Sequence, residues 1–201
     1  MKTLTLIFTF LPLIVFSVMA RFLPHDYIGV AGLVAAVMAI IAIATSHPVW
    51  PPKIINACSL VLFALIAVLG FTAGSHDDRW LATWGGAGMP LIIGLIILVL
   101  VPVVPFTEQF ARETTPPAYW SSPTFTKINR VLSAGWGLAI FAVGVSRVAA
   151  AAIKGHTTHR LPELLLGLAV PSVILLYMLR FSKSYPDRVT RHAPTQVPLA
   201  H

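Results

Sequence analysis

The chain has 201 residues, of which 57% are hydrophobic and only 10% are charged, and its mean hydropathy is +0.83. A soluble domain carries about 25% charged residues, so this composition indicates an integral membrane protein. The formal net charge of +7 comes from basic residues that stand singly beside apolar runs, and this distribution argues against a nucleic-acid partner. Cys58 is the single cysteine, which excludes an internal disulfide.

Apolar segments long enough, or nearly long enough, to span a bilayer follow one another along the chain. Their approximate ranges are 4–21, 27–46, 54–74, 86–104, 128–153 and 162–182. The first resembles a secretory signal because Lys2 precedes it, but we interpret it as a membrane helix. The fourth is the weakest, because glycines and Pro90 crowd its start, and Pro171 predicts a kink in the sixth unless a neighbour satisfies the carbonyl that it frees.

These segments predict an all-α fold, a bundle of six transmembrane helices. Residues 1–182 would form a single transmembrane domain, with a short interfacial amphipathic helix between the fourth and fifth spans. Residues 183–201 are rich in proline and basic residues without apolar periodicity, which predicts a flexible cytoplasmic tail.

The basic residues are distributed unevenly between the two sides of this expected bundle. Arg147 lies in the outer part of the fifth segment. Nine others lie on the side of the N-terminus and four on the opposite side: Lys2, Lys53, Arg112, Lys127, Arg130, Arg180, Lys183, Arg188 and Arg191, against Arg21, Arg79, Lys154 and Arg160. The positive-inside rule therefore predicts that both termini and the 105–127 connection are cytoplasmic.

Small residues recur on one face of two predicted helices. Membrane helices gain by close backbone approach at such residues, so we expect these faces to contact other helices. The faces consist of Gly32, Ala35, Ala36, Ala39 and Ala42 in the second segment, and of Ser133, Gly137, Ile140 and Gly144 in the fifth.

Residues 105–136 form the longest polar interruption of the chain. Pro105 ends the preceding helix, and Phe106 and Phe110 are spaced four apart, as are Glu108 and Arg112 in the favourable acid-first order. This spacing predicts about two turns of helix that lie flat at the membrane surface, with the rings toward lipid and the charges toward the cytoplasm.

The second half of this stretch contains the start of the fifth helix. Ser122 is suited to the N-cap and Pro123 to the first helical position. The helix would then carry Lys127, Asn129 and Arg130 into the membrane boundary, with Trp136 just inside it. We expect the Asn129 side chain to bond a neighbouring helix end or the loop backbone.

Groups that could carry chemistry are sparse. Acids, lysines and histidines are missing from the helix interiors, and Arg147 is expected to reach the outer headgroups or to pair with Asp77, Asp78 or Glu163. All seven histidines lie in predicted loops, helix ends or the tail, which argues against a buried haem. The HExxH, GxSxG and glycine-rich phosphate-loop motifs are also missing, so we expect no catalytic centre and no cofactor.

Histidines and acids do gather on the predicted outer side. Imidazole and carboxylate groups together could hold a divalent metal, but their spacing here matches no known ligand motif. We therefore expect no metal site among His25, Asp26, His76, Asp77, Asp78, His156 and His159.

Several features together resemble one family. Residues 10–16 (FLPLIVF), the short outer loop with Trp80 and Trp84 after it, and the pattern Pro117-x2-Trp120-x6-Lys127-x-Asn129 followed by Trp136 resemble the intracellular septation protein A family. The resemblance runs over about residues 10–150, and the 105–131 text is similar to an uncharacterised offshoot of that family. It implies a small multi-pass protein of the bacterial inner membrane that takes part in septation and envelope maintenance without catalytic activity.

The leading interpretation is therefore a non-enzymatic scaffold or accessory factor, bound to membrane-protein partners or to a second copy of itself. Its candidate interface residues, which could instead only hold the loop at the lipid interface, are Phe106, Glu108, Phe110, Arg112, Trp120, Lys127, Asn129, Arg130 and Trp136.

Two other classes of function remain open. The first is a small-solute or lipid transporter or channel, or an accessory subunit of a larger membrane complex. A transport path would have to use the few polar residues within the helices: Asn56, Thr72, Ser133, Ser146, Ser172 and Tyr177. The second is an enzyme that acts on a lipid at the outer face through the histidine and aspartate group.

Overall fold

The computed structural model describes residues 3–45, 53–72, 80–154 and 161–191, and for residues 3–10 and Arg21 the backbone alone. Its described part is all-α, without a strand. The long helices are α1 (Thr3–Phe22), α2 (Ile28–Ala44), α3 (Ile54–Thr72), α5 (Gly86–Leu100), α7 (Pro123–Ile153) and α9 (Val170–Arg191). Shorter elements are η1 (His25–Tyr27), the π-helical turns η2 (Leu81–Gly85) and η4 (Leu165–Ala169), α6 (Phe106–Ala111), η3 (Pro117–Tyr119) and α8 (Leu161–Leu164).

Several of these helices are long and apolar enough to cross a membrane. Five candidate spans run over His25–Ala44, Ile54–Thr72, Leu81–Leu100, Pro123–Ile153 and Leu161–Arg191, and α1 adds a shorter apolar stretch, Leu11–Ala20. By length and composition, the chain is thus a multi-pass membrane protein whose apolar helices contact the lipid bilayer.

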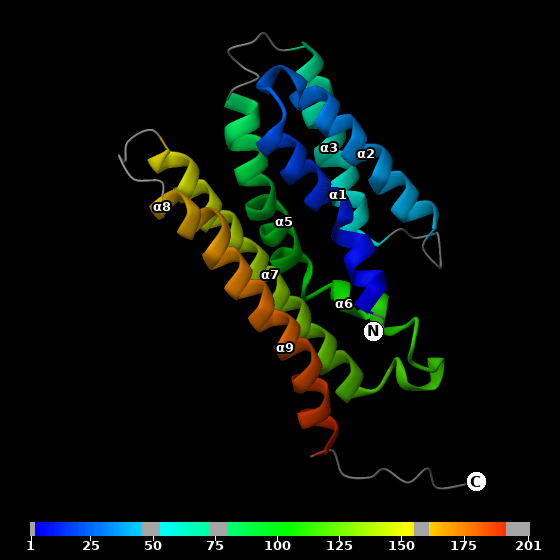
Figure 1. The fold of residues 1–201 in the computed structure, drawn as a ribbon. Coiled ribbons are helices and arrows are strands. Elements are labelled where there is room, and N and C mark those ends of the chain that lie inside the picture. Colours follow the sequence, from blue (N-terminus) through cyan, green and yellow to red (C-terminus); the bar gives the residue numbers. More distant parts are fainter. Residues whose placement is uncertain (1–2, 46–52, 73–79, 155–160, 192–201) are drawn as a thin grey trace, which may run out of the picture.

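The helices pack as two close pairs joined by α1 and by α3. Figure 1 shows α2 running along α3 and α5 along α7, with α1 against the first pair and α9 against α7. One apolar cluster, which includes Phe16 and Phe63, joins α1, α2 and α3 to the start of α5. A second cluster joins α3, α5, α6, α7 and α9 around Trp136 and Ile97. The bundle therefore has a continuous interior along its length.

Small residues set the distance within both pairs. A Cβ added to Gly32 of α2 would lie 2.7 Å from the backbone nitrogen of Ala67 in α3. One added to Gly144 of α7 would lie 2.3 Å from the backbone nitrogen of Leu91 in α5. Neither approach is possible with a side chain present, so the small-residue faces predicted from the sequence are confirmed as helix contacts.

The last helix differs from its prediction at two points. Where a kink was expected at Pro171, a π-helical turn precedes it: the Val170 N–H bonds to the carbonyl of Leu165 and leaves the carbonyl of Leu166 without its usual donor. Ser146 of α7 donates to the Leu166 carbonyl at 2.6 Å and so satisfies the acceptor that the π-helical turn leaves open. The carbonyl that loses its α-helical donor to Pro171 is a different one, that of Gly167.

At the other end, α9 continues to Arg191, whereas a tail was expected from residue 183. The aromatic side chains of Tyr177, Phe181 and Tyr185 are spaced four apart and stack in a row, with centroids 6.4 and 5.2 Å apart. This row extends the helix past the end of the apolar run. Residues 192–201 lie outside the described part.

Candidate functional site

We define the cap segment as residues 105–122, which join α5 to α7 and begin with α6. Phe106 and Phe110 of α6 are only 3% and 2% exposed, and their rings meet edge to face with centroids 6.2 Å apart. They belong to the apolar cluster that contains Ile55 of α3 and Ile97 of α5. The rings therefore pack into the protein, and the prediction that they face lipid was wrong. The reason is that α6 closes one end of the bundle (Figure 1).

Thr107 fixes α6 to α7 through buried hydrogen bonds. Its backbone N–H donates to Ser133 Oγ at 3.1 Å, and its hydroxyl lies 2.9 Å from both Ser133 Oγ and the carbonyl oxygen of Asn129. The sequence analysis did not identify Thr107, because the four-residue spacing of the phenylalanines indicates an apolar face and gives no sign of a buried hydroxyl. Thr107 stands three residues before Phe110, a spacing that places the two side chains on neighbouring parts of one helical face.

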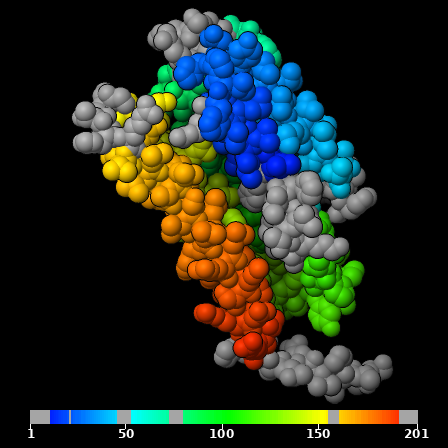
Figure 2. All heavy atoms as spheres, in the orientation of Figure 1, coloured from blue at the N-terminus to red at the C-terminus, as the bar shows by residue number. Residues whose placement is uncertain are grey.

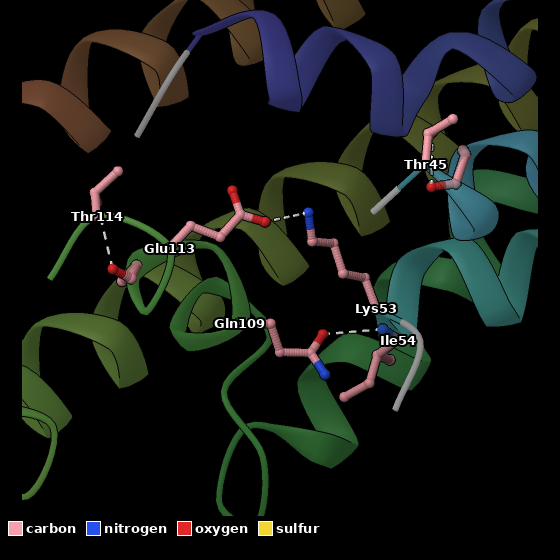
Figure 3. A network of polar contacts seen from close by, with 8 residues as sticks. Thr45, Lys53, Ile54, Gln109, Glu113 and Thr114 are labelled. Carbon is pink, nitrogen blue, oxygen red and sulfur yellow. Dashed lines mark hydrogen bonds and ion pairs between the residues drawn. The ribbon is translucent and has the colours of Figure 1, made fainter. Parts of the chain in front are cut away.

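A buried ion pair fixes the cap segment to the start of α3. The Lys53 side chain is 4% exposed, and its Nζ lies 2.5 Å from Glu113 Oε1 and 4.6 Å from the centroid of the Phe110 ring. Next to it, the backbone N–H of Ile54 donates to Gln109 Oε1 at 2.9 Å. Figure 3 shows both contacts side by side. A buried ammonium group needs such partners, so the cap segment and the start of α3 are held as one unit.

On its outer side the cap segment makes contacts of its own. Arg112 and Glu108 form the ion pair that the sequence spacing predicted. The Arg112 guanidinium also lies over the Trp120 ring, 4.9 Å from its centroid, and the Trp120 indole N–H donates to the carbonyl of Thr115 at 2.8 Å. These contacts fold the second half of the cap segment back onto the first.

Two further residues singled out from the sequence lie in the interior of the protein. Asn129 is buried, and its side-chain amide donates to the Phe125 carbonyl one turn earlier in α7. The expected bond to a neighbouring helix end or to the loop backbone is therefore not the one that forms. Trp136 is buried as well, and its indole N–H donates to Ser182 Oγ at 2.8 Å, which joins α7 to α9. Because α6 covers this part of α7, neither residue is available at the surface.

Three cations and one tyrosine are among the exposed residues of the cap segment and the first turns of α7, and we call these four residues the cap surface. Arg112 has 49% of its side chain exposed, Tyr119 is 61% exposed, and Lys127 and Arg130 on the first turns of α7 are exposed too. Arg130 also donates to the Pro102 carbonyl at 3.4 Å, so it bridges the end of α5 and the start of α7. The cap surface thus presents three cations and one tyrosine on a base held by buried contacts.

Of the predicted outer group of histidines and acids, the structure describes only two residues. The described residues contain no group of three histidine, cysteine or carboxylate side chains that could hold a metal, and of the predicted outer group they include His25 and Asp26 in η1. His76, Asp77, Asp78, His156 and His159 lie outside the described part.

The polar residues that a transport path would use do not line one path in the described helices. Ser133 bonds to Thr107, and Thr72 bonds to the carbonyl of Val68 in its own helix. Ser172 and Tyr177 lie on the exposed side of α9. Asn56 is buried, and its Oδ1 has no hydrogen-bond partner in the described part of the chain.

Comparisons of the chain with protein-family models, with curated proteins and with solved structures found no match. The resemblance to the intracellular septation protein A family therefore stays a prediction that rests on the residues named above. In the fold, Trp120 holds the cap segment together, while Asn129 and Trp136 lie beneath it in α7.

Proposed function

We propose that this protein is a non-enzymatic scaffold or accessory factor of the bacterial inner membrane, with a role in cell-envelope maintenance or septation. Both termini and the cap surface would face the cytoplasm, as the distribution of basic residues predicts. The cap surface would dock a membrane-protein partner that presents acidic groups. The observation that carries this proposal is the ion pair of the buried Lys53 with Glu113, which anchors a segment that presents exposed cations.

A docking surface gains affinity when it is ordered before its partner arrives, because less conformational entropy is lost on binding. The cap segment meets this condition through Thr107, Lys53 and Gln109, whose contacts hold it to two helices. Arginine and tyrosine are also enriched in protein interfaces. The dispersed polar groups of the helix interiors favour this function over a transporter or channel.

Site-specific photo-crosslinking in intact cells tests the proposal. A photoreactive amino acid at Tyr119 should capture a defined partner, whereas the same group at Tyr177, which is exposed on the apolar side of α9, should not. Arg112→Glu should reduce the captured product at least severalfold, because it repels an acidic partner. Glu108→Lys should also reduce it, because it removes the carboxylate that positions Arg112 and places a like charge beside it. Lys183→Glu, an equal charge reversal on α9, is the matched control.

The result that would overturn the proposal is equally definite. If the charge reversals leave both the crosslinked product and the cell phenotype unchanged while the proteins fold normally, the cap surface docks no partner. The cap segment would then serve only to close the bundle at the membrane surface.

A further inference from the structure

A cavity of about 150 Å³ lies at the end of the bundle away from α6, between α1, α5, α7 and the π-helical turns. Residues with small side chains from all of these elements line it, including Ala20, Gly86, Ala151 and Gly167. A water molecule needs about 10–15 Å³ of such space, so the cavity has room for a group of several heavy atoms. Figure 2 shows the hollow between α1 and the α8–α9 helix, with α5 and α7 behind it.

The polar groups of this cavity carry both signs of charge. Arg147 and Lys154 of α7 and Glu163 of α8 line it, together with the hydroxyls of Ser17 and Thr83. The Arg147 guanidinium bonds to Ser17 Oγ at 3.2 Å and makes a further interaction, and its five N–H donors allow it to contact a ligand in addition to these partners. Two cations and one carboxylate around one space match a ligand that itself carries an anion and a cation.

The backbone adds acceptors to the same space. Gly86 and Gly167 line the cavity, and the residues four positions after them are Pro90 and Pro171. Proline has no N–H, so the carbonyls of both glycines lack the donor that an α-helix normally supplies. Carbonyl groups without their α-helical donor, together with the Glu163 carboxylate, suit an ammonium group as the cationic part of the ligand.

Apolar side chains border the opening of the cavity. Ile14 and Val18 on α1 and Leu165 and Leu168 on η4 are exposed beside the lining residues Ser17 and Gly167. Along α7, Arg147 lies about 10 Å deeper in the bundle than Lys154 at the helix end. A polar cavity with basic groups at two depths and apolar borders fits an amphiphile better than a freely soluble ion.

We propose that this cavity binds the headgroup of a zwitterionic phospholipid that carries a primary amine, such as phosphatidylethanolamine. Arg147 and Lys154 bind the phosphodiester, and the Glu163 carboxylate, with the carbonyls of Gly86 and Gly167 beside it, binds the ammonium. The acyl chains lie along the apolar borders on α1 and η4. This binding site is separate from the cap surface and does not depend on the proposed docking role.

Lipid binding to the purified, delipidated protein in detergent tests the proposal. Phosphatidylethanolamine should bind more tightly than phosphatidylglycerol, which has the phosphodiester without the amine. Arg147→Gln should weaken the binding of both lipids about ten- to a hundredfold, because a charge-assisted hydrogen bond is lost. Glu163→Gln should remove the preference for phosphatidylethanolamine and leave the binding of phosphatidylglycerol unchanged.

Two control variants test whether a loss of lipid binding comes from misfolding or from a nonspecific effect of charge. Gly167→Leu fills the cavity without changing charge, and its Cβ would meet only the Ala150 Cβ, at 3.7 Å, so the fold should persist while lipid binding is lost. Arg130→Gln, at the other end of the bundle, should bind lipid as the wild type does. Native mass spectrometry measures the bound lipid, and Lys154→Gln provides a second charge variant at the exposed rim.

Three results would overturn the proposal. The first is a folded Gly167→Leu protein that binds phosphatidylethanolamine as tightly as the wild type. The second is a wild-type protein that does not distinguish the two lipids. The third is tight binding of soluble glycerophosphoethanolamine, equal to that of the lipid, which would assign the cavity to a free zwitterion instead.

Discussion

Replacing Glu113 with glutamine leaves the buried Lys53 ammonium without its carboxylate partner. Removing one member of a buried ion pair costs about 3–5 kcal/mol, because the remaining charge stays desolvated. Here the Glu113 side chain is 26% exposed, so solvent screens part of the interaction, and the contact between Lys53 and the Phe110 ring persists. We therefore expect a loss of about 2 kcal/mol in the free energy of unfolding, which corresponds to a melting temperature about 4–8 °C lower.

Companion variants separate the charge from the packing. Lys53→Met removes the charge, while the unbranched methionine side chain can still pack on Phe110. The double variant Lys53→Met with Glu113→Gln should therefore have a free energy of unfolding within about 1 kcal/mol of the wild type. Glu108→Gln breaks the other ion pair of the cap segment, where Arg112 is largely exposed, and should cost at most about 0.5 kcal/mol.

The chain provides its own reporter for this comparison. Cys58, the single cysteine, lies half-buried in α3 one turn beyond Lys53, so a thiol-reactive dye reports when this helix is exposed during heating. The reasoning is refuted if Glu113→Gln and Glu108→Gln melt at the same temperature. It is also refuted if adding Lys53→Met to Glu113→Gln lowers the melting temperature further.

Three further predictions follow from other contacts. Thr107→Val removes the hydroxyl that bonds Asn129 O and should cost about 1–3 kcal/mol, whereas Thr107→Ser should cost much less; equal melting temperatures for the two would contradict the hydrogen-bond argument. Gly94→Ala places a methyl group 2.4 Å from the Phe141 backbone nitrogen and should lower the melting temperature sharply, while Gly88→Ala, with no atom within 4 Å, should be tolerated. A reporter fused after His201 should be active only in the cytoplasm, and periplasmic activity would reverse the predicted orientation.

The features that sequence alone predicted are those set by local pattern. Apolar length located the helices, and the Ser122 hydroxyl does accept a hydrogen bond from the Phe125 N–H, with Pro123 at the first helical position. The small-residue faces marked the contacts of α2 and α7, because only small side chains allow backbones to approach so closely. Each of these features is determined by residues that lie within a few positions of one another in the sequence.

The features that sequence could not predict depend on residues far apart in the chain. An amphipathic turn such as α6 has the same pattern whether its rings enter lipid or protein, so burial of Phe106 and Phe110 needed the neighbouring helices to be placed. Lys53 and Glu113 each look like an ordinary loop charge until the fold brings them together. The same holds for Arg147 and Ser17, which are 130 positions apart.

The two ends of the bundle use opposite means to accommodate polar groups. At the cap segment, Lys53 and Thr107 are satisfied by other side chains of the protein, and bulky rings fill the space around them. At the other end, small side chains leave a cavity beside charged groups, and Pro90 and Pro171 withhold hydrogen-bond donors from two of its lining glycines. An end whose charges are paired within the protein is suited to present a stable surface to a partner, whereas an end with a cavity beside charged groups is suited to hold a ligand. The proposed docking surface and the proposed lipid site thus follow from one contrast in side-chain size.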